Sequence, residues 1–228
     1  MKTFKQFTNE SVRDKMIPKS DEDIKKSSEK LTPDEKITIG IKYNMVDLIK
    51  KGIEEKGIEE IEYDDSIRED LMHYSIFNNN MELAKLLIEH DLFTINYRTI
   101  NFIINNGNMD IIKLLIKDKN ISKTDILSSA IQVDNYDVVK YLISIGVEPT
   151  ENELETAVGT GNNDIVQLLL DNDVHPNINI LMNAIRNGRP KIVELLLKKG
   201  AYNEEALDYA IKLKNKKIIK LLKDYEKI

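Results

Sequence analysis

The side chains in this sequence that could do chemistry are few and scattered. Its three histidines, His73, His90 and His175, are of the type that most often binds a metal or moves a proton near neutral pH. They fall at unrelated places, within a predicted helix, at a helix end and in a turn, which argues against a shared metal site. The chain has no cysteine, so thiolate catalysis and zinc–thiolate clusters are excluded.

A second candidate for chemistry is the acidic stretch between residues 54 and 70. Its carboxylates lack the alternating Asp or Asn and the central Gly of a calcium loop, which favours a solvated acidic segment. The glycines occur singly in predicted turns rather than in a phosphate-binding loop. No serine lies in a nucleophile elbow. We therefore predict that the chain is not an enzyme and uses no cofactor and no metal.

The composition predicts a soluble, ordered protein. Hydrophobic residues make up 41% and charged residues 32% of the 228 residues, which is too apolar for a disordered chain. Its apolar runs are far shorter than a membrane span, and its first residues lack the apolar centre of a secretory signal. The net charge of −6 argues against general nucleic-acid binding. We expect an intracellular monomer with no membrane partner.

Side chains that bind or react would have to be positioned by the secondary-structure elements of a tandem repeat. Aligned phrases of the form Leu-x-x-Ala recur at Leu127, Leu154, Leu181 and Leu207, and their alanines are separated by 27, 27 and 26 residues (157 − 130, 184 − 157 and 210 − 184). Degraded copies lie in register at Met72 and Ile100, where Ser75 and Ile103 take the place of the alanine; we call the place of the alanine the aligned position. Seven residues after each aligned position comes a second phrase, such as "DIIKLLI" from Asp110 or "DIVQLLL" from Asp164. The sequence therefore encodes repeated units.

Each unit is predicted to be a pair of short helices. Leu-x-x-Ala-Ile places apolar side chains at i, i+3 and i+4, along one stripe of a helix. A polar turn containing Gly or Asn can end that helix and cap the next one. The second phrase is apolar at most positions, which indicates a helix packed between neighbours, and an acidic residue opens four of the second helices, where the helix dipole favours it.

These units resemble ankyrin repeats. The resemblance is carried by "MHYSI" from Met72, "GNNDIVQLLL" from Gly161, "GVEP" from Gly146, "DVHPN" from Asp173 and "LLLKKGA" from Leu195. The units are about six residues shorter than the usual repeat of about 33 residues. The missing part would form the β-hairpin finger and the Thr-Pro helix start, and no T-P-L-H phrase occurs. We expect an all-α solenoid of about seven helix-turn-helix repeats, including degenerate end caps, with little or no β-structure.

The resemblance implies a binding groove on the concave face, lined by the first helices and by the residues just before the turn. Tyr, Phe and Arg are the types that carry most binding energy at interfaces. The corresponding residues are Tyr74, Phe77, Asn78, Phe102, Asn105, Asn106, Gln132, Thr160, Asn183, Arg186, Asn187, Tyr209 and Lys212. Aromatic residues gather in the early units and basic residues in the late ones. The alternative is that some of them are ordinary exposed or half-buried solenoid residues.

The predicted organisation has a leader and polar linker over residues 1–31 and a solenoid over residues 32–228. Within the solenoid we expect an N-terminal cap repeat with an acidic connection at 32–65, central repeats at 66–202 and a C-terminal cap at 203–228. Leu48, Ile49 and Ile53 are expected to point inward in the first pair. In the last pair lysines replace apolar residues on the outward side.

The opening "MKTFKQFTNE" resembles the leaders of internal head proteins of T-even-type tailed phages. The resemblance is carried by Met1, Lys2, Thr3, Phe4, Phe7 and Glu10. It implies targeting into the prohead and cleavage after Glu10, although the position two residues earlier holds Thr8 where the family's cleavage signal prefers an aliphatic residue. The alternative is an amphipathic start whose phenylalanines pack on the first repeat.

Two functions follow as hypotheses. The main one is a non-enzymatic protein–protein interaction module that binds a macromolecular partner through the concave face, as a phage-encoded effector that acts on a host protein in the host cytoplasm. The alternative is a structural or internal protein of a tailed-phage virion, packaged in the head and without a specific groove ligand.

Overall fold

The computed structural model describes residues 28–43, 45–57, 60, 65–90, 92, 97–106, 109–117 and 121–226. These residues form fourteen α-helices, one short 3₁₀ helix and no strand, which confirms the predicted all-α architecture. No helix in this part of the chain is both long and apolar enough to cross a membrane. Glu10 and the predicted leader lie outside the described residues, as do residues 58, 59 and 61–64 of the acidic stretch.

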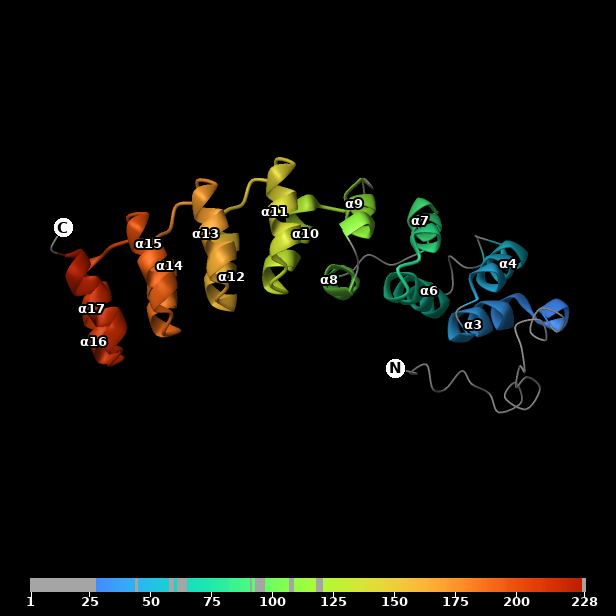
Figure 1. The fold of residues 1–228 in the computed structure, drawn as a ribbon, viewed down its shortest axis with the longest axis horizontal. Coiled ribbons are helices and arrows are strands. Elements are labelled where there is room, and N and C mark those ends of the chain that lie inside the picture. Colours follow the sequence, from blue (N-terminus) through green and yellow to red (C-terminus); the bar gives the residue numbers. More distant parts are fainter. Residues whose placement is uncertain are drawn as a thin grey trace. The chain divides into compact units, whose positions relative to one another are not determined.

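The helices come in consecutive pairs (Figure 1). After the 3₁₀ helix η2 (Ser28–Lys30) the pairs are α3 (Pro33–Tyr43) and α4 (Val46–Lys56), α6 (Asp65–Phe77) and α7 (Met81–Glu89), α8 (Tyr97–Asn106) and α9 (Met109–Lys117), α10 (Lys123–Gln132) and α11 (Tyr136–Ser144), α12 (Glu151–Thr160) and α13 (Asn163–Asp171), α14 (Ile178–Arg186) and α15 (Pro190–Lys198), and α16 (Glu204–Lys212) and α17 (Lys216–Tyr225). We call the members of each pair the first and the second helix.

The chain divides into two compact units. One unit comprises residues 1–74 and 89–93, and the other comprises residues 75–88 and 94–228, so that α6 contributes to both. We refer to them as the N-terminal unit and the repeat unit.

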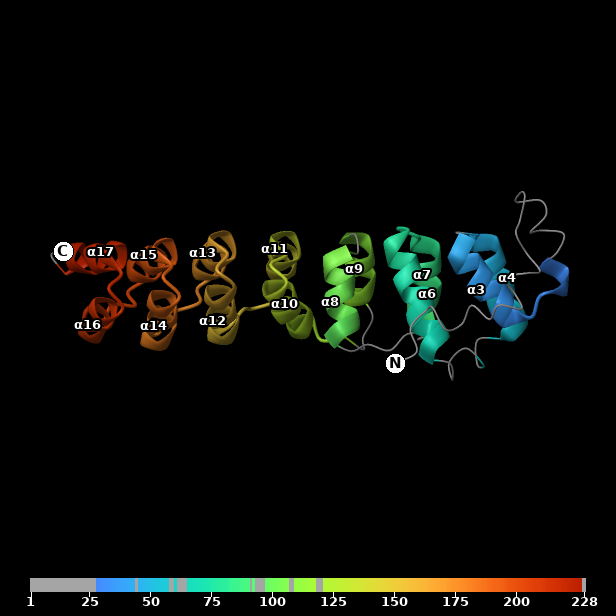
Figure 2. The same cartoon turned by 90° about the horizontal axis from the view of Figure 1, so that it is seen from below.

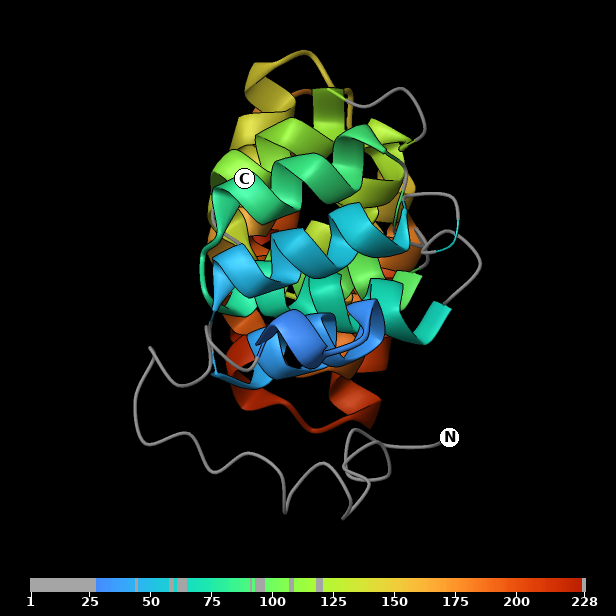
Figure 3. The ribbon, with the colours of Figure 1, turned by 90° about the vertical axis from the view of Figure 1, so that its right-hand side faces the viewer.

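The N-terminal unit is built around the close pair α3 and α4, drawn in blue in Figure 3. Leu48, Ile49 and Ile53 are buried, as predicted. Two glycines allow the close approach, since a Cβ at Gly40 would lie 2.5 Å from Cγ1 of Ile49, and one at Gly52 would lie 2.8 Å from the carbonyl oxygen of Pro33.

Ion pairs tie the same two helices together at their polar sides. Lys36 is buried and pairs with Glu55, and Nζ of Lys56 lies 2.6 Å from Oδ1 of Asp34.

In the repeat unit, helices pack on their counterparts in the next pair. First helices contact first helices from α8 through α10, α12 and α14 to α16, and second helices contact second helices from α11 through α13 and α15 to α17. Figures 1 and 2 show these pairs side by side in chain order. The aligned alanines are fully buried: Ala130, Ala157, Ala184 and Ala210. Their small side chains let neighbouring helices approach closely, and this close packing excludes solvent from them.

The turns of the repeat depend on residues in the left-handed backbone conformation. In the five repeats whose turn the structure describes, the residue four positions after the aligned one has a positive φ; these residues are Asn79, Asp134, Gly161, Gly188 and Lys214. A second series with positive φ, Gly146, Asp173 and Gly200, follows the second helices at intervals of 27 residues (173 − 146 and 200 − 173). Gly, Asn and Asp adopt this conformation at least cost, which explains why they predominate in both turns.

Side chains at the helix starts satisfy backbone N–H groups that would otherwise have no partner. Oδ1 of Asn162 accepts from the N–H groups of Asp164 and Ile165, and Oδ1 of Asn135 accepts from that of Val138. Thr150 and Glu153 form a capping box at the start of α12. The predicted role of Asn in these turns is therefore confirmed.

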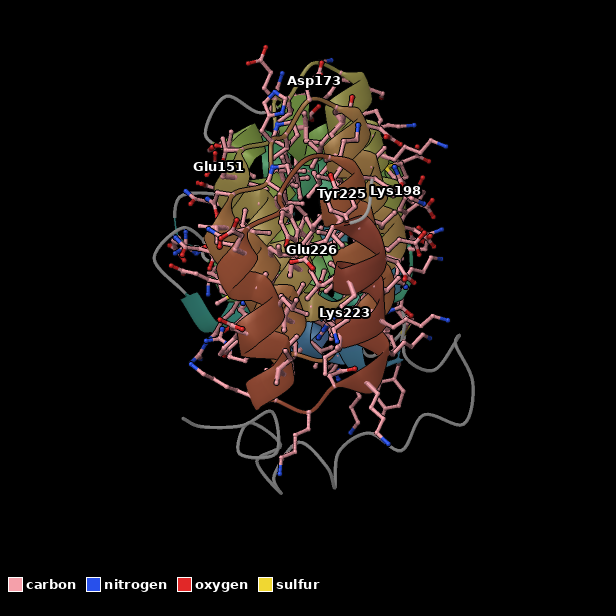
Figure 4. The ribbon with its side chains drawn as sticks, turned by 90° about the vertical axis from the view of Figure 1, so that its left-hand side faces the viewer. Glu151, Asp173, Lys198, Lys223, Tyr225 and Glu226 are labelled. Carbon is pink, nitrogen blue, oxygen red and sulfur yellow. The ribbon has the colours of Figure 1, made fainter. Side chains whose placement is uncertain are left out.

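The last pair differs from the others in its outward face. Lys216, Lys217, Lys220 and Lys223 are exposed, as expected from the sequence. Ile211 is also exposed, at 47%, although the corresponding residue of each earlier pair of the repeat unit is buried. Tyr202, in the turn before α16, donates a hydrogen bond to Glu226 at the end of α17, and this bond raises the pKa of Tyr202 to about 12. Figure 4 labels Tyr225 and Glu226 at this end of the chain.

Candidate interaction surface

One position of the first helix is exposed in every pair of the repeat unit. It lies two residues after the buried aligned position, at or close to the end of the helix. We call this set the edge row; it consists of Phe77, Asn105, Gln132, Gly159, Arg186 and Lys212. Because first helices pack on first helices from α8 to α16, the members of the row on these helices lie along one side of the repeat unit.

The edge row is available for contacts because the fold does not use its side chains. Phe77 is 77% exposed, the largest exposure among the large hydrophobic residues that the structure describes. The side chains of Asn105, Gln132, Arg186 and Lys212 make no hydrogen bond or ion pair with another described residue. An exposed aromatic side chain and unengaged polar side chains are typical of a surface that acquires partners on binding.

The predicted groove residues one position further on are engaged in the ends of their own helices. Nδ2 of Asn106 donates to the carbonyl of Phe102 at 3.1 Å, and the hydroxyl of Thr160 donates to the carbonyl of Ala157 at 3.0 Å. Nδ2 of Asn187 donates to Oδ1 of Asn183 at 2.6 Å. These three exposed residues therefore stabilise the helix ends beside the edge row, and Asn78 is exposed at the same position of its repeat.

The predicted groove residues that directly precede the aligned position are less accessible to solvent. Phe102, Asn183 and Tyr209 are half-buried. Tyr74 is buried, with 5% of its surface exposed, and this burial raises the pKa of its hydroxyl. The structure thus places the predicted residues two and three positions after the aligned one at an exposed edge, and it places Tyr74 in the interior.

Arg189 is a member of this surface that the sequence interpretation missed. It directly precedes the second helix α15, at the position that holds Asn80, Asn108, Asn135, Asn162 or Asn215 in the other repeats. Its Nη2 donates to the carbonyl oxygen of Gly159 at 2.9 Å, one repeat earlier. A Cβ on Gly161 would lie 1.0 Å from Nη1 of Arg189, so the guanidinium fills the space that the glycine leaves.

The asparagines at the same position form a ladder between repeats. Nδ2 of Asn135 donates to the carbonyl of Ile104 at 2.9 Å, and Nδ2 of Asn162 donates to Oδ1 of Asp134 at 2.6 Å. Arg189 continues this ladder with a longer, charged side chain. The single break in a row of asparagines was the signal in the sequence that could have identified it.

A second network connects the repeats at the starts of the first helices. The Ser128 hydroxyl donates to Oε1 of Glu153 at 2.7 Å, and Nδ2 of Asn177 donates to Oε2 of Glu151 at 2.7 Å. Burial is the largest single influence on Glu153 and raises the pKa of its carboxyl. Hydrogen bonds from Thr150 and Ser128 outweigh it, so that the pKa lies below its usual value. This network positions the helices and is separate from the edge row.

No group of three metal-ligating side chains occurs within the described residues. His73, His90 and His175 lie at different places: on the first helix α6, just after the second helix α7 and in the turn before α14.

Comparison with protein families identifies the repeat. The family model described as "Ankyrin repeats (3 copies)" matches residues 71–153 and again residues 154–228. Each match spans three of the helix pairs described above, and α3 and α4 lie outside both. No curated protein matches the chain. Since the two matches together cover more than half of the chain, this protein belongs to the ankyrin repeat family.

Proposed function

We propose that the chain is a non-enzymatic module that binds a protein partner along the edge row. The observation that carries the proposal is the contrast between neighbouring positions. In each pair of the repeat unit the aligned residue is buried, whereas the residue two positions later is exposed, and the five of these residues that carry a side chain do not use it in the fold. A row of side chains that stability does not require, presented by rigid helix ends, is suited to recognition.

The variable composition of the row supports a specific partner. Its members change from aromatic at Phe77 through amides at Asn105 and Gln132 to cations at Arg186 and Lys212, while the buried positions beside them stay apolar or small. Aromatic and Arg side chains contribute most to binding energy at protein interfaces. The repeat thus keeps its packing constant and changes its contact chemistry along the chain.

Site-specific photo-crosslinking in host-cell lysate tests this function. A photoreactive amino acid replaces Gln132 in the edge row or, as a matched control, Lys140, which is exposed on the second helix α11 of the same pair. We expect a discrete crosslinked protein from position 132 and none from position 140. Equal products from both positions, or none from either, would contradict the proposal and would favour the passive structural role.

Affinity measurements then test the individual side chains. Against the crosslinked partner, the triple variant Phe77→Ala/Gln132→Ala/Arg186→Ala should bind at least about tenfold more weakly, a loss of about 1.4 kcal/mol or more. The variant Lys113→Ala/Lys140→Ala, on the second helices α9 and α11, should bind like the wild type. Tyr74 is left unchanged because it is buried and its removal would disturb packing.

The leader resemblance supports a finer proposal, that the protein is encoded by a tailed phage, packaged in the virion and delivered to the host cytoplasm to act on a host protein. Mass spectrometry of purified virions should then detect a mature chain that begins at Ser11, after cleavage at Glu10. Virions without the chain would contradict packaging and would leave the binding function to the crosslinking experiment.

A further inference from the structure

The turns that follow the first helices differ in charge between the early and the late repeats. In each of the last three repeats we consider the segment of four residues that begins with the member of the edge row. The three segments are Gly159–Asn162, Arg186–Arg189 and Lys212–Asn215. These segments contain four cations and no carboxylate. We call Arg186, Arg189, Lys212 and Lys214 the basic edge.

The basic edge forms no ion pair within the described structure. Arg186, Lys212 and Lys214 are exposed, and no ion pair joins any of the four cations to a described carboxylate. Nearby lysines at the end of the second helix α15 do find such partners, since Nζ of Lys198 lies 2.7 Å from Oε1 of Glu194 and Nζ of Lys199, the next residue, lies 3.5 Å from Oδ1 of Asp171. The fold therefore leaves positive charge unneutralised at the turn side.

Arg189 is held in place without being saturated. Its Nη2 is fixed by the carbonyl of Gly159, and the glycine at 161 leaves room for the guanidinium. Its Nε–H and Nη1–H groups make no hydrogen bond to a described acceptor. A pre-positioned guanidinium with free donors is well suited to a carboxylate, which it can bind through two parallel hydrogen bonds.

The early repeats present amides at the same edge. The corresponding residues include Asn105, Asn106 and Gln132, and Asp134 is the one carboxylate among them, where it already accepts a hydrogen bond from Asn162. Asn and Gln side chains offer both a donor and an acceptor, as a peptide backbone requires. An extended segment can therefore lie along these repeats with little demand on its own sequence.

From these observations we infer that the edge row takes an extended peptide segment of a partner protein whose acidic residues lie against the basic edge. This inference rests on the proposed function and adds the chemistry of the partner. Neighbouring helices pack about 8–10 Å apart, and an extended chain advances about 3.3 Å per residue. One repeat thus corresponds to about three residues of the segment, and acidic residues about three positions apart would meet successive repeats.

Selection from a displayed library of random 12-residue peptides tests the inference. The immobilised full chain is compared with the charge-reversal variant Arg186→Glu/Lys212→Glu and with the control Lys198→Glu/Lys223→Glu. The control changes the net charge by the same amount on the second helices α15 and α17; Figure 4 labels both lysines. We expect Asp and Glu about three positions apart to be enriched by the wild type and by the control, and to be lost with the edge variant.

Binding of one selected peptide gives the quantitative result. Fluorescence anisotropy should show at least about tenfold weaker binding to the edge variant and an unchanged Kd for the control. Raising the ionic strength from about 0.1 M to about 1 M should weaken binding, because exposed charges are then screened over about 3 Å. Circular dichroism and thermal unfolding of both variants verify that the fold is retained.

Each other outcome overturns the inference. Selected peptides without acidic enrichment, or acidic peptides that bind the edge variant equally well, would show that the basic edge does not choose the partner. If such neutral peptides still depend on Phe77 and Gln132, the proposed function stands and only its acidic chemistry fails. Absence of any selected peptide overturns both. Tighter binding of a labelled single-stranded DNA than of any peptide would assign the basic edge to nucleic acid.

Discussion

Glu153 performs two structural tasks through a single carboxylate. Its Oε2 accepts a hydrogen bond from the N–H of Thr150 at 3.0 Å and completes the capping box of α12. Its Oε1 accepts from the hydroxyl of Ser128 in the preceding repeat. One residue thus fixes the start of a helix and the contact of that helix with its neighbour.

Replacing Glu153 should destabilise the chain in a pH-dependent way. Because hydrogen bonds hold the pKa of its carboxyl below the ordinary value of 4.5, ionised Glu153 stabilises the folded state fully above that pH. The contribution is lost as the pH falls through the lowered pKa. We expect Glu153→Ala to reduce the free energy of unfolding by roughly 1–2 kcal/mol at pH 7 and by less at pH values below 4.5.

Urea unfolding at a series of pH values measures this difference. The matched control is Glu155→Ala, which removes an exposed carboxylate from the same helix and should change the stability by less than about 0.5 kcal/mol. A deficit for Glu153→Ala that stays constant through the acid range would contradict the assigned role of its ionised form.

At the scale of elements, the two glycines near the end of α12 have opposite requirements. Gly159 lies within the helix, and a Cβ there would meet no atom within 4 Å. Gly161 ends the helix with a φ of 92°, and a Cβ there would meet the guanidinium of Arg189. The same chemical change should therefore have opposite effects two residues apart.

We expect Gly161→Ala to lower the free energy of unfolding by about 1–3 kcal/mol, because the left-handed backbone becomes strained and Arg189 is displaced. Gly159→Ala should raise it by roughly 0.5–1 kcal/mol, since alanine loses less backbone entropy in a helix. Chemical denaturation of the two variants gives both values. Equal effects of the two substitutions would contradict the assigned geometry of this turn.

At the scale of the whole molecule, each repeat is stabilised by the repeats beside it. Leu169 on α13 and Leu222 on α17 occupy the same place in their repeats, twelve residues after Ala157 and Ala210, and both are fully buried. Described repeats lie on both sides of Leu169, whereas Leu222 belongs to the last described pair. In a repeat protein, stability is the sum of the terms for single repeats and for the interfaces between neighbours.

Leu169→Ala should therefore destabilise the repeat unit by about 2–5 kcal/mol, with loss of protection along the repeats that flank α13. Leu222→Ala should mainly reduce the protection of α16 and α17 and should reduce the stability of the other repeats less. Amide hydrogen exchange resolved by helix distinguishes the two patterns. A uniform loss of protection from Leu222→Ala would show that the repeats unfold as one cooperative block rather than from the last described pair.

Some of this structure was predictable because it depends on local chemistry and on periodicity. The 27-residue interval, the apolar stripe around each aligned alanine and the Asn or Gly of each turn predicted helix pairs without strands, and the described part of the chain confirms them. The exposure of Arg186 and Lys212 also followed from this register. The helical period determines which side of each helix is apolar, so the sequence alone specified the repeat, its turns and its exposed edge.

Only the tertiary structure decided which side chains on that edge remain available. Tyr74 is buried, Asn106, Thr160 and Asn187 hydrogen-bond within their own helix ends, and Arg189 crosses to the preceding repeat. These outcomes depend on the distance between helices and on the length of each side chain, which helical periodicity does not contain. A repeat pattern fixes positions within one unit, whereas contacts between units form only when the helices are stacked.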